Sequence, residues 1–238
     1  MNIIKKLPEN LINQIAAGEV IERPSSALKE LLENSIDAGS TEIEIFITDG
    51  GKSLIEVVDN GRGMTANDLK MCLQRHATSK ITDGDLVNIN SLGFRGEALP
   101  SIGSIAEITI DTHDRAKNES WNISIINNTL QDIVPSTIRE GTKVTIRDLF
   151  SKVPARLKFL KTNGTEVRYC REIVKHLAMS HPNIAFSFNI DAKRNFYWNK
   201  SEEIDFLSTK NRLKQIMGED FLNSSVSVEE ERPGMILV

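Results

Sequence analysis

Residues 54–63 have the sequence LIEVVDNGRG, in which Asp59 ends an apolar run and Gly61 and Gly63 follow at once. Leucine, isoleucine and valine around a single glutamate predict a strand. Glycine permits backbone conformations with positive φ and lets a ligand approach the main chain closely. This stretch therefore predicts a strand that ends in a carboxylate beside a glycine-rich turn.

Two helices and a strand are predicted before this stretch. Apolar residues recur at helical spacing over residues 11–15, and Gly18 is expected to stop that helix. A second helix begins at Pro24, because the first helical turn tolerates a residue without an N–H, and it ends at residues 37–39. Residues 42–47 alternate between apolar and polar side chains, which predicts a strand joined to residues 54–58 by a glycine turn.

Helices and strands are also predicted after residue 63. Thr65 is expected to cap a helix, because Thr65 and Asp68 have the spacing of a capping box. Residues 75–100 are rich in small and polar residues and are predicted to form a long loop, and a loop of that length in a compact domain is usually functional. Strands are expected over residues 105–112, 121–126, 142–147, 186–190 and 196–198, and helices over 166–179 and 211–217.

The order of these elements predicts an α/β sandwich with a mixed sheet and helices that cover one face. We expect one domain over residues 1–205, ending in a polar linker at 199–205. Residues 206–238 are expected to begin a second domain, because the final apolar run at 235–238 has the pattern of a strand that is cut short. The sequence thus predicts one complete domain and the start of another.

The composition indicates a globular protein. The 238 residues carry 29 Lys and Arg against 33 Asp and Glu, a formal net charge of −4, and 39% of them are hydrophobic. This balance excludes a disordered chain, and no apolar run reaches the roughly 18 residues of a membrane span. The negative charge argues against a wholly basic nucleic-acid-binding protein. Two cysteines, Cys72 and Cys170, make no disulfide framework, so we expect a reduced cytoplasmic protein.

Glu30 and Asn34 are the first candidate site residues. They are four positions apart in a predicted helix, so they project from the same face. A carboxylate and an amide oxygen side by side can hold a water molecule and a hard cation such as Mg²⁺, which prefers oxygen ligands and keeps several waters. A solvated helix face is the alternative for an isolated pair at this spacing, so the assignment depends on further motifs.

Asp59 is a candidate for binding a base. A carboxylate at the end of a strand can accept a hydrogen bond from an exocyclic amine such as adenine N6, and an ordinary turn is the alternative. Residues 61–66 also match the dinucleotide-binding pattern G-x-G-x-x-A. That interpretation is disfavoured, because a long loop follows in place of a crossover to a parallel strand.

The long loop supplies candidates for binding phosphate. Thr78, Ser79 and Lys80 offer two hydroxyls and an ammonium group, and residues 93–99 place two glycines before a predicted helix. Backbone N–H groups at a helix N-terminus bind anions, and the helix dipole assists them. An ordinary surface loop is the alternative, and the sequence contains no Walker A motif.

Two weaker signals lie further along the chain. Thr142 begins a predicted strand after Gly141, and its hydroxyl can hydrogen-bond a base edge. Arg156, Lys158 and Lys161 form a small basic cluster. Contact with DNA phosphates and a solvated loop are both open for that cluster.

Together these motifs resemble those of the GHKL ATPase superfamily, and longer strings are similar to the MutL family of DNA mismatch-repair proteins. The strings are residues 13–24 (NQIAAGEVIERP), 29–39 (KELLENSIDAG), 75–80 (RHATSK), 91–99 (SLGFRGEAL), 148–150 (DLF) and 154–156 (PAR). The RHATSK form is similar to that of bacterial members. The resemblance covers nearly the whole chain and implies the GHKL, or Bergerat-type, two-layer α/β sandwich with a mixed, mostly antiparallel sheet.

The resemblance implies an ATP–Mg²⁺ site and a role for each of its residues. Glu30 is the expected general base that activates the attacking water, and Asn34 is the expected Mg²⁺ ligand. The adenine and ribose are expected to contact Asp59, Gly61, Gly63, Met64 and Thr142. The phosphates are expected to be enclosed by a lid that comprises Thr78, Ser79, Lys80, Leu92, Gly93, Phe94, Arg95, Gly96, Glu97, Ala98 and Leu99.

The resemblance also implies a process and partners. It implies a slow ATPase that acts as a nucleotide-gated switch between mismatch recognition and downstream repair, and that self-associates when ATP binds. DNA and other repair proteins are expected to be bound through the longer protein, and a phosphate-contacting lysine is expected in the second domain. Two alternatives stay open: an interaction module with negligible hydrolysis, and another GHKL ATPase such as a topoisomerase subunit or a kinase domain.

Overall fold

The structure is a computed structural model that describes residues 8–74, 77, 96–202, 206–226, 230–232 and 235–237. Its helices are α1 (Glu9–Val20), α2 (Pro24–Asp37), α3 (Ala66–Met71), α4 (Ala98–Ile105), α5 (Pro154–Leu157), α6 (Asn163–Ser180), α7 (Phe206–Met217) and α8 (Glu219–Asn223), with a 3₁₀ turn η1 (Asp49–Gly51). Its strands are β1 (Glu42–Thr48), β2 (Leu54–Asp59), β3 (Glu107–Asp114), β4 (Glu119–Ile126), β5 (Thr129–Leu130), β6 (Val134–Pro135), β7 (Thr142–Arg147), β8 (Ala185–Ile190), β9 (Lys193–Trp198), β10 (Glu230–Arg232) and β11 (Met235–Leu237). The fold is α/β, as the sequence predicts.

Nine strands form one mixed sheet in the order β5-β4-β3-β7-β2-β1-β8-β9, with β6 paired to β4. β1 and β8 are parallel, and the other described pairs of this sheet are antiparallel. The predicted mixed, mostly antiparallel sheet is therefore confirmed. β10 and β11 form a separate antiparallel pair.

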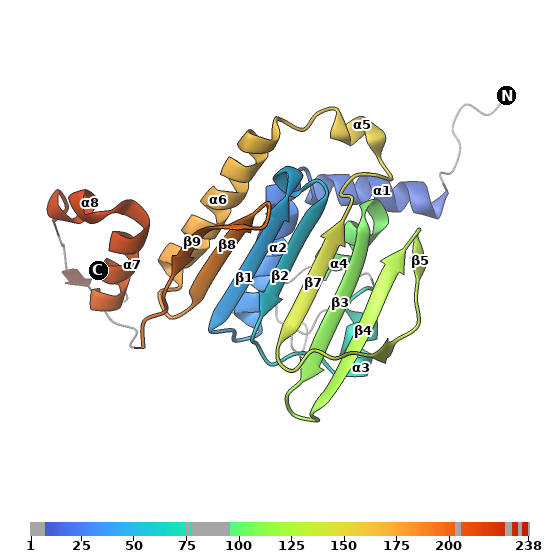
Figure 1. Ribbon diagram of the computed structural model, residues 1–238, viewed down its shortest axis with the longest axis horizontal. Coiled ribbons are helices and arrows are strands. Elements are labelled where there is room, and N and C mark those ends of the chain that lie inside the picture. The colour runs from blue at the N-terminus through green and yellow to red at the C-terminus, as the bar shows by residue number, and fades with distance from the viewer. Residues whose placement is uncertain are drawn as a thin grey trace.

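Helices cover one face of the sheet (Figure 1). α2 contacts β2, α4 contacts β3 and α6 contacts β8. Successive side chains of a strand point to opposite faces, so one alternate set faces the helices. Ile43, Ile45 and Ile47 of β1 belong to that set, and they are buried in one apolar cluster with Leu28 and Leu31 of α2. The core therefore lies between the helices and this face of the sheet.

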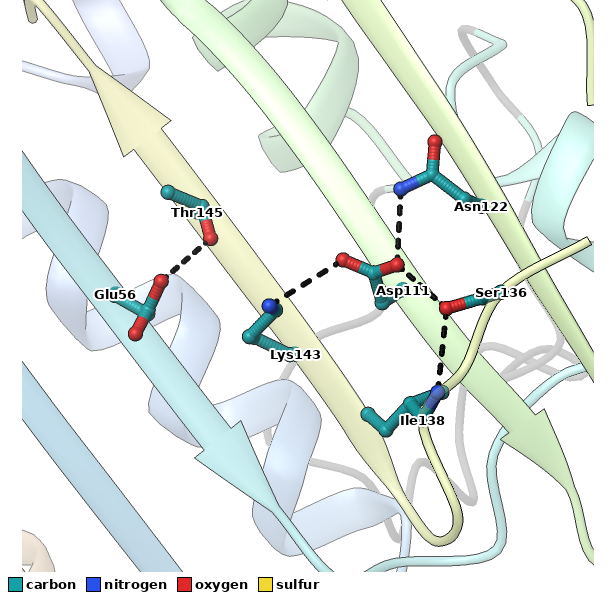
Figure 2. A network of polar contacts seen from close by, with 7 residues as sticks. All are labelled: Glu56, Asp111, Asn122, Ser136, Ile138, Lys143 and Thr145. Atoms are coloured by element: carbon teal, nitrogen blue, oxygen red, sulfur yellow. Dashed lines mark hydrogen bonds and ion pairs between the residues drawn. The ribbon is translucent and has the colours of Figure 1, made fainter. Parts of the chain in front are cut away.

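The intervening strand positions carry polar side chains on the opposite face (Figure 2). Asp111 of β3 lies 3.6 Å from the ammonium group of Lys143 in β7, and it accepts a 2.6 Å hydrogen bond from Ser136. Thr145 of β7 donates a 2.8 Å hydrogen bond to Glu56 of β2. These contacts join neighbouring strands on the side away from the helices.

Two predicted helix starts are confirmed, and one predicted helix end is wrong. Pro24 lies in the first turn of α2, and Thr65 Oγ1 accepts a hydrogen bond from the Asp68 N–H at the start of α3. α1, however, continues through Gly18 to Val20. Glycine weakens a helix but does not by itself end one. Position 18 of this helix has no room for a side chain, because Arg156 packs against it: a Cβ there would be 1.6 Å from Arg156 Nη2.

α7 is attached to the sheet through a buried arginine. The Arg212 guanidinium donates hydrogen bonds to the carbonyl oxygens of Ala178 in α6, Ile184 before β8 and Asn199 after β9, at 3.1, 2.7 and 2.9 Å. Burial lowers the pKa of Arg212 to about 10. The division of the chain after residue 205 stays a prediction, since residues 203–205 lie outside the described residues.

The helices of the described ranges are all too short or too polar to cross a membrane. The longest of them, α6, has 18 residues. Glu166, Arg168 and Lys175 are among its charged side chains.

Candidate functional site

Three neighbouring central strands carry polar residues near one of their ends, on the face toward the helices, and this row is called the polar edge of the sheet. Asp59 is the last residue of β2, and it pairs with Thr142, the first residue of β7. Thr142 pairs in turn with Thr112 of β3. All three residues are buried, and each follows apolar residues in the inward row of its strand or, for Thr142, precedes them. Antiparallel pairing thus brings together residues that are far apart in the sequence.

Asp59 accepts hydrogen bonds from two directions. It is 7% exposed, and its Oδ2 accepts a 2.8 Å hydrogen bond from the hydroxyl of Ser35 in α2. Its Oδ1 accepts a 2.8 Å hydrogen bond from the Gly61 N–H. Burial raises the pKa of Asp59 above its ordinary value, although the hydrogen bonds from Gly61 and Ser35 lower it in part. The carboxyl group is fixed in position and keeps lone pairs for a further donor.

Thr142 and Thr112 form a second polar unit beside Asp59. Their hydroxyl oxygens are 3.0 Å apart, and Thr112 Oγ1 accepts a 3.0 Å hydrogen bond from the Met64 N–H. Thr112 thereby joins two of the predicted site residues, Met64 and Thr142.

Gly63 passes close to the neighbouring strand β3. Its φ is +71°, and a Cβ at this position would lie 1.8 Å from the carbonyl oxygen of His113. Glycine adopts positive φ without steric cost, and here it also leaves the carbonyl oxygen its space. The turn after Asp59 therefore lies against β3, next to Thr112.

α2 carries the predicted general base and the predicted metal ligand. Glu30 and Asn34 are both half-buried on this helix. Asn34 directly precedes Ser35, whose hydroxyl is bonded to Asp59. The Ser40 hydroxyl donates a 2.6 Å hydrogen bond to the Ser35 carbonyl oxygen, which holds the end of the helix. These contacts place Asn34 near Asp59, with Glu30 about one helical turn further along.

The donors on α2 are suited to a hard cation. Carboxylate and amide oxygens are the ligands that Mg²⁺ accepts, and in phosphate-binding sites Mg²⁺ keeps waters and takes one or two protein oxygens. Within the described ranges, no group of three or more His, Cys, Asp or Glu side chains can hold a metal ion by itself. Glu30 and Asn34 supply one carboxylate and one amide oxygen of the kind that such a cation accepts.

The start of α4 is the described part of the predicted phosphate-binding segment. Gly96, Glu97, Ala98 and Leu99 are half-buried, with Glu97 at the N-cap position. A Cβ on Gly96 would lie 2.4 Å from the carbonyl oxygen of Ala77, so the two backbones are in contact. N–H groups in the first turn of a helix are donors for an anion. Thr78, Ser79, Lys80, Leu92, Gly93, Phe94 and Arg95 lie outside the described residues.

An open depression lies beside the glycine turn. Its volume is about 430 Å³, and it is lined by Arg62, Gly63, Thr65, Asp68, Asp114, Arg115 and Ala116. Arg115 Nη2 donates a 3.0 Å hydrogen bond to the Asn60 carbonyl oxygen, which links the turn after β3 to the turn after Asp59. The lining thus carries two arginines and two aspartates.

Ser35 and Thr112 are site residues that the sequence motifs did not indicate. Thr112 follows Ile108 and Ile110 in the inward row of β3. Ser35 lies four positions after Leu31 on the buried side of α2. A hydroxyl side chain at an apolar-face position is the available signal, because a buried hydroxyl needs a hydrogen-bonding partner.

The described groups suit three chemical tasks. Asp59 and Thr142 offer an acceptor and a hydroxyl to a flat hydrogen-bonding group such as a base edge. α2 offers a carboxylate and an amide to water and a cation, and the start of α4 offers N–H groups to an anion. A nucleoside phosphate with its cation presents all of these partners together.

Residues 21–148 match the family model described as histidine kinase-, DNA gyrase B- and HSP90-like ATPase. The matched range contains α2, the strands β2, β3 and β7, and the residues Asp59, Thr112 and Thr142. The match therefore covers more than half of the chain and the whole polar edge of the sheet.

Curated relatives are similar over nearly the whole chain. The DNA mismatch repair protein MutL of Rhodopseudomonas palustris (strain BisB18) is 45% identical over 234 residues, which cover 98% of this chain and 39% of that protein. The DNA mismatch repair protein MutL of Bradyrhizobium sp. (strain ORS 278) is 46% identical over 229 residues, which cover 96% of this chain and 37% of that protein. The chain thus spans less than two fifths of the length of these relatives.

Solved structures share the fold. The Aquifex aeolicus MutL ATPase domain complexed with ADP has a TM-score of 0.67 and 29% identity, covering 83% of this chain and 70% of that one. The N-terminal domain of a DNA repair protein has a TM-score of 0.71 and 26% identity, covering 87% of this chain and 60% of that one. These likenesses agree with the predicted two-layer GHKL sandwich.

Proposed function

Because the chain belongs to the family of histidine kinase-, DNA gyrase B- and HSP90-like ATPases, we propose that it binds ATP with Mg²⁺ and hydrolyses it slowly, as part of a MutL-type mismatch-repair protein. The observation that carries this proposal is the buried row of Asp59, Thr142 and Thr112 attached to α2. A nucleotide as ligand is also supported by the similar Aquifex aeolicus domain, which is complexed with ADP.

Asp59 recognises the adenine base in this proposal. Its carboxylate accepts a hydrogen bond from the exocyclic amine, in addition to those from Ser35 and Gly61. A carboxylate accepts and does not donate, so it favours a base that presents an amine over one that presents a carbonyl. Thr142 contacts the same side of the ring, and Gly61, Gly63 and Met64 line the base and ribose.

Glu30 activates water for hydrolysis. Its carboxylate orients the water and accepts a proton as the water oxygen bonds to the γ-phosphorus. The bond between that phosphorus and the β–γ bridging oxygen breaks, so ADP and inorganic phosphate are the products. Asn34 holds Mg²⁺ through its amide oxygen, and the bound ion supplies charge neutralisation at the phosphates. The Ser35–Asp59 hydrogen bond sets α2 relative to the base.

The phosphates lie against the start of α4. The first-turn N–H groups after Gly96 and Glu97 face the negative charge, which the helix dipole also favours. Ala98 and Leu99 belong to the same turn. The predicted contacts from Thr78 to Lys80 and from Leu92 to Arg95 complete this part of the proposal, supported by the resemblance of those strings.

In the longer protein, the nucleotide acts as a switch between mismatch recognition and downstream repair. DNA and other repair proteins are the proposed partners, and ATP promotes self-association of this region. Similarity to two MutL proteins, of which the chain covers 39% and 37%, supports these roles. Slow hydrolysis suits a switch, because the lifetime of bound ATP then sets the duration of the signal. A cytoplasmic location stays a prediction.

Calorimetric titration with a non-hydrolysable ATP analogue and Mg²⁺ tests the proposal. We expect the wild-type chain to bind, and Asp59→Asn to bind at least about tenfold more weakly, because a hydrogen bond to a charged group is lost. Glu56→Gln is the matched control, since Glu56 lies on the same strand but on the face away from the helices (Figure 2). A wild-type chain that does not bind, or an equal loss in both variants, contradicts the proposal.

A further inference from the structure

The C-terminal ends of α1 and α4 are both capped from the segment between β7 and α6, which consists of a loop and the short helix α5. A helix leaves its last carbonyl oxygens without intrahelical partners, and cations near that end satisfy them and complement the helix dipole. Neither α1 nor α4 has a basic residue in its last turn. The cations come instead from Lys152, in the loop that follows β7, and from Arg156, in the short helix α5 of the same segment.

Lys152 caps α4. Its ammonium group donates hydrogen bonds to the carbonyl oxygens of Gly103 at 3.1 Å and of Ala106 at 2.8 Å. Gly103 lies in the last turn of α4, and Ala106 is its C-cap residue. Burial lowers the pKa of Lys152 from its ordinary value, and the charge of Glu107 raises it in part. The two carbonyl oxygens therefore bind an ammonium group that is partly removed from water.

Arg156 caps α1 in the same way. Its Nη1 donates hydrogen bonds to the carbonyl oxygens of Gly18 at 2.8 Å and of Ile21 at 3.2 Å. The approach requires glycine at position 18, where a Cβ would collide with the guanidinium group. Of the basic cluster at Arg156, Lys158 and Lys161, the first is therefore engaged within the molecule, whereas both lysines are exposed.

The backbone of this loop has an unusual conformation. Asp148 and Phe150 have φ values of +52° and +69°, a region that bulky residues rarely adopt. The Phe150 side chain is fully buried, and its N–H donates a 3.0 Å hydrogen bond to the carbonyl oxygen of Ile105, the last residue of α4. Such strain persists only where surrounding contacts over-determine it. The loop is therefore a defined attachment point for α4.

The two capped helices also contact each other. α1 and α4 pack together, and Figure 1 shows them with α5 at one end of the sheet. α4 is about 12 Å long, and the end opposite Lys152 is the segment that begins at Gly96. A shift at one end of a short rigid helix moves the other end. Thr142, which is proposed to contact the base, is the first residue of β7, and the loop that carries Lys152 begins where β7 ends.

We infer that Lys152 and Arg156 are positioning residues that hold α1 and α4 as one unit, so that the start of α4 meets the phosphates while Asp59 and Thr142 hold the base. This inference rests on the proposed function. Neither side chain contacts the nucleotide. Each acts through the helix whose C-terminal end it caps.

Lys152→Met and Arg156→Met test the inference, because methionine retains much of the aliphatic stem and removes the charge. We expect each variant to bind the Mg²⁺-loaded ATP analogue roughly fivefold more weakly while its affinity for adenosine changes little. We also expect faster hydrogen exchange at the amides of α4. Lys152→Arg keeps a cation at the helix end, and it is expected to restore most of the affinity for the analogue.

Arg212→Met is the matched control, because Arg212 caps α6, which lies beside β8 near the edge of the sheet away from β3 and α4. We expect it to lower the Tm without changing the ratio of the affinity for the ATP analogue to the affinity for adenosine. An unchanged ratio in both loop variants, or the same change in Arg212→Met, overturns the inference. If a loop variant does not fold, Lys152→Gln and Gly18→Ala replace it and are judged by the same ratio. A wild-type chain that binds adenosine and the analogue equally overturns the inference, whereas one that binds neither contradicts the proposed function itself.

Discussion

The hydroxyl of Ser35 donates a 2.8 Å hydrogen bond to Oδ2 of Asp59, and so joins α2 to the end of β2. Both residues are buried. α2 carries Glu30 and Asn34, and β2 carries the carboxylate proposed to bind the base. This contact therefore connects the proposed site of base recognition directly to the helix proposed to act at the phosphates.

Removal of this contact should weaken both the fold and the site. We expect Ser35→Ala to lower the free energy of unfolding by about 1–3 kcal/mol, because a buried carboxyl oxygen loses its donor. Affinity for the ATP analogue should fall as well, since Asp59 is less firmly placed. Ser53→Ala is the control, because Ser53 also donates to a carboxylate, that of Asp49, but at an exposed position. Equal effects of the two substitutions in urea unfolding and titration would contradict the role of Ser35.

The pH dependence of stability should report the burial of Asp59. Its pKa is raised in the fold above the ordinary value of 3.8, because burial disfavours the charged form. Its contribution is complete below the unfolded-state pKa and is lost as the pH rises through the folded-state pKa. We therefore expect nucleotide-free Asp59→Asn to be more stable than wild type at neutral pH, with the difference shrinking toward acid pH. Denaturant unfolding over a pH series measures this, and a difference that does not vary with pH would count against it.

Glu30→Gln should separate binding from hydrolysis. We expect the variant to bind the ATP analogue as wild type does and to hydrolyse ATP about 10²–10⁴-fold more slowly, because the general base is lost. Single-turnover phosphate release measures the rate without interference from product release. Glu33→Gln is the control on the same helix, where Glu33 pairs with Lys29 at 2.8 Å. Normal hydrolysis by Glu30→Gln would show that another group is the base.

Gly63 and Gly39 allow a matched comparison of two glycines. Their φ values are +71° and +74°, but a Cβ on Gly39 would meet nothing within 4 Å. We expect Gly39→Ala to cost about 1–2 kcal/mol of stability through backbone conformation alone. Gly63→Ala should cost at least about 2 kcal/mol more, because its Cβ would collide with the His113 carbonyl oxygen. Thermal unfolding of the two variants checks this, and equal losses would mean that the turn relaxes away from β3.

Local patterns were sufficient for most of the elements that form the site. The alternation of residues 42–47 and 54–58 predicted β1 and β2, and Thr65 with Asp68 predicted the start of α3. Asp59, Glu30 and Asn34 were candidates from residue type and spacing alone. Each of these inferences depends on neighbours within a few positions, where side-chain direction follows from helix or strand geometry.

Contacts between distant segments could not be predicted in this way. Gly18 was expected to end α1, but Arg156, which is 138 positions away, explains why glycine lies inside the helix. Thr112 was not a candidate, because its role depends on strand pairing with Thr142. Register between strands and the approach of a loop to a helix end are set by the packing of the whole chain.

The order of the longer helices and strands, the strand that ends in Asp59 and the helix face of Glu30 and Asn34 thus follow from the amino-acid sequence, because periodicity and turn chemistry act over a few residues. The tertiary structure alone decided that Ser35 and Gly61 hold Asp59, that Thr112 joins Met64 to Thr142, and that the segment between β7 and α6 caps two helices. The physical reason is that a buried polar group takes its partner from whichever segment packs against it. That partner is fixed by the three-dimensional packing and has no local signature in the sequence.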